Sequence, residues 1–127
     1  MIEAIDHVVL TVRDPDAAAA FYARVLGMEP LTFAGNRRAV RFGGQKINLQ
    51  RLGDETRNHA TIGSGDLCLL TRWPTSQTLA HLAAEGVEVV EGPVRKSGAR
   101  GTITSVYFRD PDGNLIEISR YGGEEDQ

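Results

Sequence analysis

The sequence contains a single cysteine, Cys68, so it cannot form an internal disulfide bond. It has no apolar run of the about 20 residues that a membrane-spanning helix needs, and no secretory leader precedes Ile5. It also lacks an excess of basic residues, because 14 Lys and Arg are set against 17 Asp and Glu for a formal charge of −3. These absences predict a cytoplasmic protein without nucleic-acid or membrane partners.

Aromatic residues are scarce as well, at 6% of the chain, which leaves few to line a large apolar pocket. The hydrophobic fraction of 41% and the charged fraction of 24% are ordinary for a soluble globular protein. A length of 127 residues suits one domain, or two small halves that share a core. We expect a single domain over residues 1–127, ending in an acidic tail at 122–127.

The most informative stretch lies near the end of the chain, at residues 105–119. Its centre, Asp-Pro-Asp-Gly at 110–113, has the composition of a type I turn between two strands of a hairpin. In the returning strand Ile116 and Ile118 share one face, and Glu117 lies between them on the other. An enclosed carboxylate is costly unless it is paired, hydrogen-bonded or bound to a metal. Glu117 is therefore the first candidate functional residue.

The chain as a whole predicts two successive βαβββ modules. Module one covers about residues 1–53, with a strand at 5–12, a helix at 17–26 and strands at 28–33, 38–42 and 46–50. Residues 54–64 are rich in turn formers and predict a linker. Module two covers about residues 65–121, with a strand at 66–71, a helix at 74–85, a strand at 87–91 and then the closing hairpin.

The two modules align at one constant separation, which indicates a tandem duplication. A separation of 59 positions relates His7 to Asp66, Pro15 to Pro74, Gly27 to Gly86 and Glu29 to Glu88. The alternative is a chance reuse of common turn residues. If the duplication is real, the fold is α+β, and the polar positions of the two modules converge on one cavity. Those positions are His7, Asp66, Glu117 and its counterpart Asn48, with Gln50 on the same face as Asn48.

Three motifs resemble the vicinal oxygen chelate superfamily, which includes glyoxalase I, fosfomycin resistance proteins, extradiol dioxygenases and bleomycin-binding proteins. They are Asp-His-Val-Val-Leu-Thr-Val at 6–12, Phe-Tyr with Leu-Gly at 21–27, and Arg-Asp-Pro-Asp-Gly-Asn-Leu-Ile-Glu at 109–117. The match spans roughly residues 4–121. Shorter matches, such as Gln-Lys-Ile-Asn-Leu at 45–49, look most like a branch of small bacterial glyoxalase domain-containing virulence proteins.

The resemblance implies a cup-shaped, partly open curved sheet that holds a divalent metal on matching strands. Carried over by position, the first-strand histidine is His7 and the last-strand carboxylate is Glu117. The sequence departs from the family at Asp66, where metal-dependent members commonly have histidine, and at Asn48, where glyoxalase I has a carboxylate. One histidine with two carboxylates favours Mn²⁺, Fe²⁺ or Mg²⁺, although Ni²⁺ and Zn²⁺ stay open.

Each candidate metal ligand also has an ordinary structural interpretation. His7 would be a hydrogen-bonded core histidine, and Glu117 would form a salt bridge with an arginine such as Arg38, Arg41 or Arg109. Asp66, which follows a Gly-Ser-Gly segment, would cap backbone amides at the strand entry. Cys68 would be a small buried hydrophobe.

The remaining candidates would contact substrate. Tyr107 shares a face with Ser105 and either lines the cup or packs in the core. Arg95 begins a basic, glycine-rich segment at 95–101, which is either a solvated loop or a mobile lid over an anionic substrate. Asn48 and Gln50 complete the expected substrate-binding set.

Two functions follow from these expectations. The first is a metal-dependent enzyme, a lyase or isomerase of the glyoxalase kind or a dioxygenase-like enzyme. In it a small substrate with vicinal oxygens chelates the metal and Glu117 moves the proton. The alternative is a metal-free binding protein that sequesters a small molecule in the same cup. In either case the open sheet edges predict a homodimer.

Overall fold

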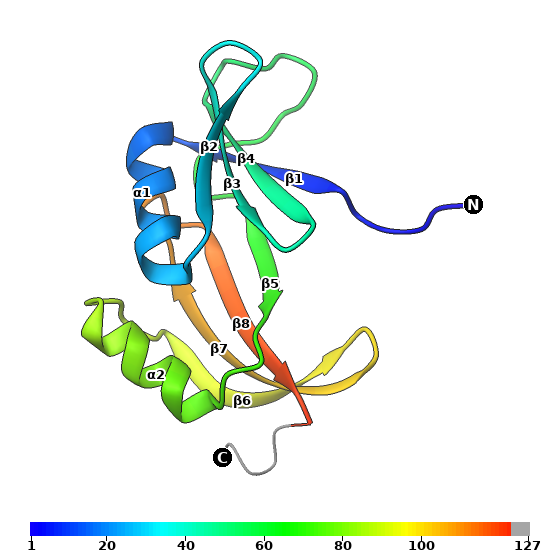
Figure 1. Cartoon of the computed structure of the whole chain (residues 1–127), viewed down its shortest axis with the longest axis vertical. Helices are drawn as coiled ribbons and strands as arrows, with labels where there is room; N and C mark the ends of the chain where they lie inside the picture. The colour runs from blue at the N-terminus through cyan, green and yellow to red at the C-terminus, as the bar shows by residue number, and fades with distance from the viewer. Residues whose placement is uncertain (123–127) are drawn as a thin grey trace. The chain divides into compact units, whose positions relative to one another are not determined.

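The structure is a computed structural model and describes residues 1–122 of the chain. The acidic tail expected at 122–127 therefore lies, except for its first residue, outside the described residues. The described chain forms two compact units, each with one four-stranded sheet and one helix (Figure 1). The first unit contains Met1–Gly65 and Pro111–Asn114, and the second contains Asp66–Asp110 and the residues from Leu115 onward. Each unit is a βαβββ module, so the α+β fold predicted from the sequence is confirmed.

The first unit contains β1 (His7–Val12), α1 (Pro15–Leu26), β2 (Glu29–Phe33), β3 (Arg37–Phe42) and β4 (Gln45–Arg51). The strand order is β1-β4-β3-β2, with β1 parallel to β4 and the other pairs antiparallel. Helix α1 packs along β2, β3 and β4 (Figure 1). The apolar residues of alternate strand positions, such as Leu10, Val40 and Ile47, are buried in the core of this unit.

Helix α1 begins and ends where the sequence predicts. The side chain of Asp14 accepts hydrogen bonds from the amides of Asp16 and Ala17, which satisfies two of the free N–H groups of the first turn. Gly27 ends the helix in the left-handed conformation, at φ 68°, and its amide donates to the carbonyl of Ala23. These caps fix the length of the helix, and with it the point at which β2 starts.

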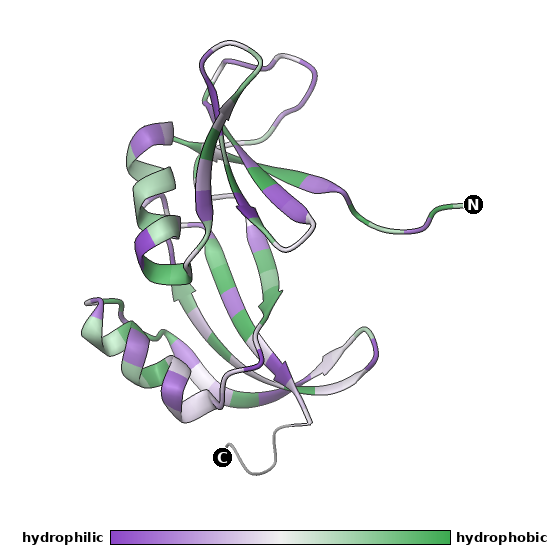
Figure 2. Cartoon of the chain, in the orientation of Figure 1, coloured by the Kyte–Doolittle hydropathy of each residue, from purple (hydrophilic) through white to green (hydrophobic). Residues whose placement is uncertain are grey.

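The second unit contains β5 (Asp66–Leu70), α2 (Thr75–Ala84), β6 (Glu91–Gly98), β7 (Gly101–Arg109) and β8 (Leu115–Tyr121). Its strand order, β5-β8-β7-β6, repeats that of the first unit. Figure 2 shows hydrophobic and hydrophilic residues alternating along β8, as expected for a strand with two different faces. Ile116 of β8 is fully buried, as is Phe108, its partner on the neighbouring strand β7. None of the helices in residues 1–122 is long and apolar enough to cross a membrane.

The internal registers of the two sheets support the duplication. In the first sheet Val9 pairs with Asn48, and in the second Cys68 pairs with Glu117. Cys68 follows Val9 by the same 59 positions that relate the other matched residues. Asn48 and Glu117 thus occupy equivalent places in their sheets, as the sequence predicted.

One strand differs from the prediction. The expected strand at 87–91 is irregular up to position 90, and β6 covers Glu91–Gly98 instead. The expected loop at 95–101 is consequently a β-ribbon in which Arg95 pairs with Thr104 of β7. The strand forms here because the long neighbouring strand β7 supplies its backbone hydrogen bonds, a contact that the local sequence does not reveal. The register shift between Glu91 and Val94 accommodates Gly92 and Pro93 as a bulge.

Candidate functional site

The site is centred on Glu117, in the middle of β8. Cys68 of β5 and Tyr107 of β7 flank Glu117 in the sheet register, so the three side chains share one face. They open onto a cavity of about 460 Å³ within the second unit. The cavity is also lined by Leu70, Lys96, Ser97, Gly98, Ala99, Ile103 and Tyr121. Glu117 is therefore the carboxylate of a mainly apolar depression that could hold a small molecule.

Two serine hydroxyls hold the carboxylate of Glu117. Ser105 Oγ donates to Glu117 Oε2 over 2.6 Å, and Ser119 Oγ donates to the same oxygen over 3.2 Å. Ser105 is 0% exposed and Ser119 is 1% exposed. Hydrogen bonds of this kind fix the orientation of a carboxylate.

Two of the three arginines considered as salt-bridge partners of Glu117 pair with other carboxylates in the structure. Arg38 Nε lies 3.0 Å from Asp16 Oδ1, and Arg41 pairs with Glu29. Both pairs lie in the first unit. In the described part of the chain, the carboxylate of Glu117 is hydrogen-bonded by the two serines.

The neighbours of Glu117 are held in their protonated forms. Burial raises the pKa of the Cys68 thiol, its hydrogen bond with Ser119 opposes this, and the charge of Glu117 adds to the rise. Partial burial and the negative charge of Glu117 raise the pKa of Tyr107 to about 12. At neutral pH both Cys68 and Tyr107 thus carry a hydrogen that they can donate.

His7 lies at the start of β1 in the first unit, with its side chain 41% exposed, so it is not a core histidine. Its Nδ1 lies 2.9 Å from Asp6 Oδ2. A carboxylate at Nδ1 favours the tautomer with the proton on that nitrogen, which leaves the lone pair of Nε2 available. Metal-binding histidines commonly have this arrangement.

Asp66 is exposed at the start of β5, and its side chain makes no hydrogen bond within residues 1–122. The neighbouring amide of Gly65 is instead satisfied by Asn114 Oδ1, over 2.7 Å. Asn114 is 0% exposed. The capping role considered for Asp66 is therefore filled by Asn114, which the sequence analysis missed. The signal was the asparagine that follows Asp-Pro-Asp-Gly, a residue type that often hydrogen-bonds to backbone.

Asn48 and Gln50 lie on β4 and are each 7% exposed. Gln50 Nε2 donates to Thr11 Oγ1 over 2.8 Å and to Asn58 Oδ1 over 3.3 Å, which ties the linker to the sheet. Asn48 Oδ1 is buried without a hydrogen-bond partner among the residues that the structure describes. A buried carbonyl oxygen of this kind is expected to bind a donor or a cation.

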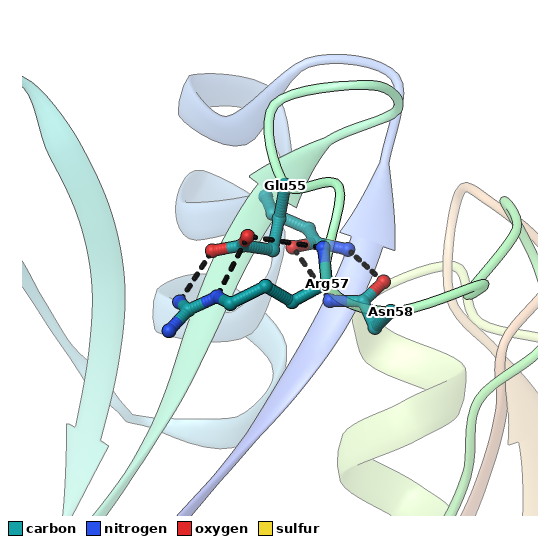
Figure 3. Close-up of polar contacts among 4 residues, drawn as sticks. Glu55, Arg57 and Asn58 are labelled. Atoms are coloured by element: carbon teal, nitrogen blue, oxygen red, sulfur yellow. Dashed lines mark hydrogen bonds and ion pairs between the residues drawn. The ribbon is translucent and has the colours of Figure 1, made fainter.

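The linker has an ion pair of its own next to these contacts. Figure 3 shows the guanidinium of Arg57 against the carboxylate of Glu55, with Asn58 beside them. The hydrogen bonds from Arg57 lower the pKa of Glu55 to about 2. Gln50 and Glu55 also line a second cavity, of about 740 Å³, in the first unit. The linker is therefore held by specific contacts at both its start and its middle.

The expected ligands are not gathered within either unit. Across residues 1–122 no group of three or more His, Cys, Asp and Glu side chains is close enough to hold a metal ion. His7 belongs to the first unit, whereas Asp66 and Glu117 belong to the second. Of the residues expected to contact substrate, Tyr107 shares the cavity of Glu117, and Arg95 is exposed on β6.

Comparisons with known proteins cover nearly the whole chain. The family model described as "Glyoxalase/Bleomycin resistance protein/Dioxygenase superfamily" matches residues 4–118. Virulence protein STM3117 of Salmonella typhimurium is 48% identical over 95% of this chain and 86% of its own length. Glyoxalase domain-containing protein RDO1 of Mycosarcoma maydis is 45% identical over 94% of this chain and 69% of its own length. The structure of an integron cassette protein of V. cholerae superposes with a TM-score of 0.91, at 48% identity, over 96% of this chain and 98% of that one.

Proposed function

Because the chain belongs to the glyoxalase/bleomycin resistance protein/dioxygenase superfamily, we propose that it is a metal-dependent enzyme acting on a small substrate with vicinal oxygens. Members of the superfamily include metal-dependent glyoxalases and fosfomycin-resistance enzymes. The reaction is then of the lyase, isomerase or dioxygenase-like kind, at the cavity of Glu117.

The arrangement of Glu117 is the main observation behind this proposal. Its Oε2 accepts hydrogen bonds from two buried serine hydroxyls, and Cys68 and Tyr107 flank it with hydrogens that they can donate. The carboxylate is therefore held in a fixed orientation at the cavity, where it can meet a ligand.

We assign the metal ligands to His7, Asp66 and Glu117. Three features of these residues suit a divalent cation: Nε2 of His7 is left free by the Asp6 contact, Asp66 is exposed, and Glu117 is a carboxylate that two serines hold in place. Such a donor set suits Mn²⁺, Fe²⁺ or Mg²⁺, and the buried Oδ1 of Asn48 lacks a partner that a bound group would supply. A bound cation would supply Lewis-acid stabilisation of an oxyanion.

The side chains around Glu117 then have distinct roles. Besides its place in the ligand set, Glu117 is the candidate base that moves the proton of the substrate. Tyr107 remains protonated because of its raised pKa and donates a hydrogen bond to an oxygen of the substrate that gains negative charge. Asn48, Gln50 and Arg95 complete the contacts with the substrate.

Metal analysis of protein purified without chelators tests the proposal. We expect near-stoichiometric divalent metal in the parent and its loss in His7→Ala. His59→Ala is the matched control, since His59 is exposed in the linker. If the parent binds no metal even after incubation with Mn²⁺ and Zn²⁺, the enzyme proposal is wrong and the chain is the metal-free binding protein that we considered as the alternative.

Two substitutions test the role of Asp66. Asp66→Asn removes a charge from the ligand set and should weaken Mn²⁺ binding, while the fold is retained because Asn has nearly the same shape. Asp66→His introduces a nitrogen ligand and should shift preference toward Zn²⁺ or Ni²⁺. Titrations of the parent and both variants that give the same isotherms would remove Asp66 from the ligand set.

We also propose that the working form is a homodimer. Val9 and Leu70 are 38% and 57% exposed on strands β1 and β5, which are edge strands of their sheets. Exposed apolar residues on open edges are commonly covered by a second copy. Light scattering at micromolar concentration should give twice the chain mass of 13.8 kDa, and a monomer mass would contradict the proposal.

A further inference from the structure

We propose that the second unit contains a binding site for a phosphate group, separate from the cavity of Glu117. The site is a cavity of about 560 Å³, lined by Leu70, Thr71, Arg72, Arg100, Arg120 and Tyr121. Three of these residues are arginines and none is acidic, so the lining attracts anions. The site goes beyond the proposed function, because it involves no metal and none of the residues assigned to the enzyme.

The topology of the second sheet places Arg72 beside the end of β8. Strands β5 and β8 are parallel, and Leu70 at the end of β5 pairs with Ser119. The amide of Thr71 continues this contact by donating to the carbonyl of Ser119 over 3.0 Å. Thr71 Oγ1 accepts a hydrogen bond from the amide of Trp73 over 3.1 Å. The residues on both sides of Arg72 are therefore tied by hydrogen bonds, which limits the positions that its guanidinium can take.

Arg100 reaches the same cavity from the turn between β6 and β7. Gly98 pairs with Gly101 at the end of this ribbon, so Arg100 belongs to the turn itself. Its amide donates to Tyr121 Oη over 3.0 Å, and its Cζ lies 4.4 Å from the centre of the Tyr121 ring. This cation–π contact orients the guanidinium without neutralising its charge. Gly98 leaves the necessary room, since a Cβ there would lie 2.8 Å from Tyr121 Oη.

The cavity offers hydrogen-bond donors as well as charge. Thr71 Oγ1 and Tyr121 Oη each accept from a backbone amide, and their own protons have no acceptor within residues 1–122. In that part of the chain the guanidinium groups of Arg72 and Arg100 form no ion pair. Guanidinium groups bind phosphate through pairs of parallel hydrogen bonds. A phosphate group brings a charge of about −1.5 to −2 and three strong acceptor oxygens, which match these donors.

The cavity of the first unit has a different balance of charge. It also contains three arginines, but three carboxylates line it with them: Arg37, Arg38 and Arg51 with Asp16, Asp54 and Glu55. Arg38 pairs with Asp16, and Glu55 pairs with Arg57. The protein itself therefore balances the charge of that cavity, and we expect no phosphate binding there. Arg37, exposed on β3, supplies the matched control.

Titration of ¹⁵N-labelled protein with inorganic phosphate, followed by NMR at constant ionic strength, tests the site. We expect saturable shifts of the amide signals of Arg72, Arg100 and Tyr121. Arg72→Ala and Arg100→Ala should each weaken phosphate binding by about 5- to 10-fold, the effect of losing one partly exposed, charge-assisted contact. Arg37→Ala removes the same charge from the other unit, and its affinity should stay within about 2-fold of the parent.

Glycerol 3-phosphate is the second probe, because a phosphate group can come from the free ion or from an ester. Either probe supports the site if it binds, and tighter binding of the ester identifies an organic phosphate as the ligand. The absence of saturable shifts with both probes would overturn the proposal, as would equal phosphate affinities in Arg72→Ala, Arg100→Ala and Arg37→Ala. None of these outcomes depends on metal binding, so they are distinct from a failure of the proposed function.

The acidic residues Glu124, Glu125 and Asp126 follow Tyr121 closely in the sequence and are the competing anions that the test must separate. The triple variant Glu124→Gln, Glu125→Gln and Asp126→Asn serves this purpose in the full chain. Phosphate should bind both the parent and the triple variant. Binding that occurs in the triple variant alone would assign the arginines to the chain's own carboxylates and overturn phosphate as the ligand.

Discussion

Asn114→Ala tests how the segment that leads into Asp66 is held. Asn114 is fully buried, and its Oδ1 accepts a hydrogen bond from the amide of Gly65 over 2.7 Å. The site is tightly packed, because a Cβ added to Gly65 would lie 2.8 Å from this oxygen and 2.5 Å from Leu10 Cδ2. Removing the amide side chain leaves the N–H of Gly65 without its partner.

The loss of this hydrogen bond sets the expected decrease in the free energy of unfolding. A lost hydrogen bond that leaves a buried donor unsatisfied costs about 1–3 kcal/mol. Gly65 is only half-buried, so water can partly replace the lost acceptor, and we expect about 1–2 kcal/mol. A chain of 127 residues has an unfolding entropy near 0.27 kcal/mol/K, at about 2.1 cal/mol/K per residue. The melting temperature should therefore fall by about 4–8 °C.

Calorimetric melting and urea unfolding of the parent and Asn114→Ala measure this cost. Asn36→Ala is the matched control, because Asn36 is exposed in the β2–β3 turn, and it should melt within about 1 °C of the parent. Mn²⁺ affinity should also fall in Asn114→Ala, since Asp66 directly follows the released amide. A melting temperature for Asn114→Ala equal to that of the control would refute the argument.

Three further predictions concern charge and packing. Glu117→Gln should lower the pKa of Tyr107 from about 12 toward 10, because it removes a negative charge that opposes ionisation of the phenol. The pKa can be followed by ¹³C NMR of labelled tyrosine, and an unchanged pKa of Tyr107 in the variant would contradict the prediction. The lowered pKa of Glu55 gives a stability contribution that is present above pH 4.5 and is lost as the pH falls toward 2. Arg57→Ala should remove that part of the acid dependence in unfolding titrations, and an unaltered profile would contradict it. Phe108→Ala should lower the free energy of unfolding, measured with urea, by about 3–5 kcal/mol, because Phe108 is 0% exposed in the core of the second unit. A decrease under about 1 kcal/mol would contradict the burial of Phe108 in that core.

Local patterns in the sequence predicted most of the fold. The alternation around Glu117, the Asp-Pro start of α1 and the glycine after it are each set by neighbours within a few residues, so a single sequence reveals them. The constant separation of 59 positions predicted the matched topologies, and the register that pairs Asn48 and Glu117 with equivalent neighbours agrees with it. The resemblance to the superfamily is confirmed by the family match.

Contacts between distant strands decided the rest. The extent of β6 depended on its pairing with β7, which turns the loop expected at 95–101 into part of a β-ribbon. The amide of Gly65 found its partner in Asn114, 49 positions away. No local pattern encodes such a pairing, because it depends on which segments the folded chain brings together.

The same division applies to the candidate site. Sequence alone identified Glu117 as a carboxylate that needs a partner, and alternation placed it on the face opposite to Ile116 and Ile118. Only the tertiary structure showed that the hydroxyls of Ser105 and Ser119 reach the same oxygen of Glu117. Sequence spacing determines which face a side chain occupies, but the strand register determines which atoms meet there, and hydrogen bonds depend on atoms.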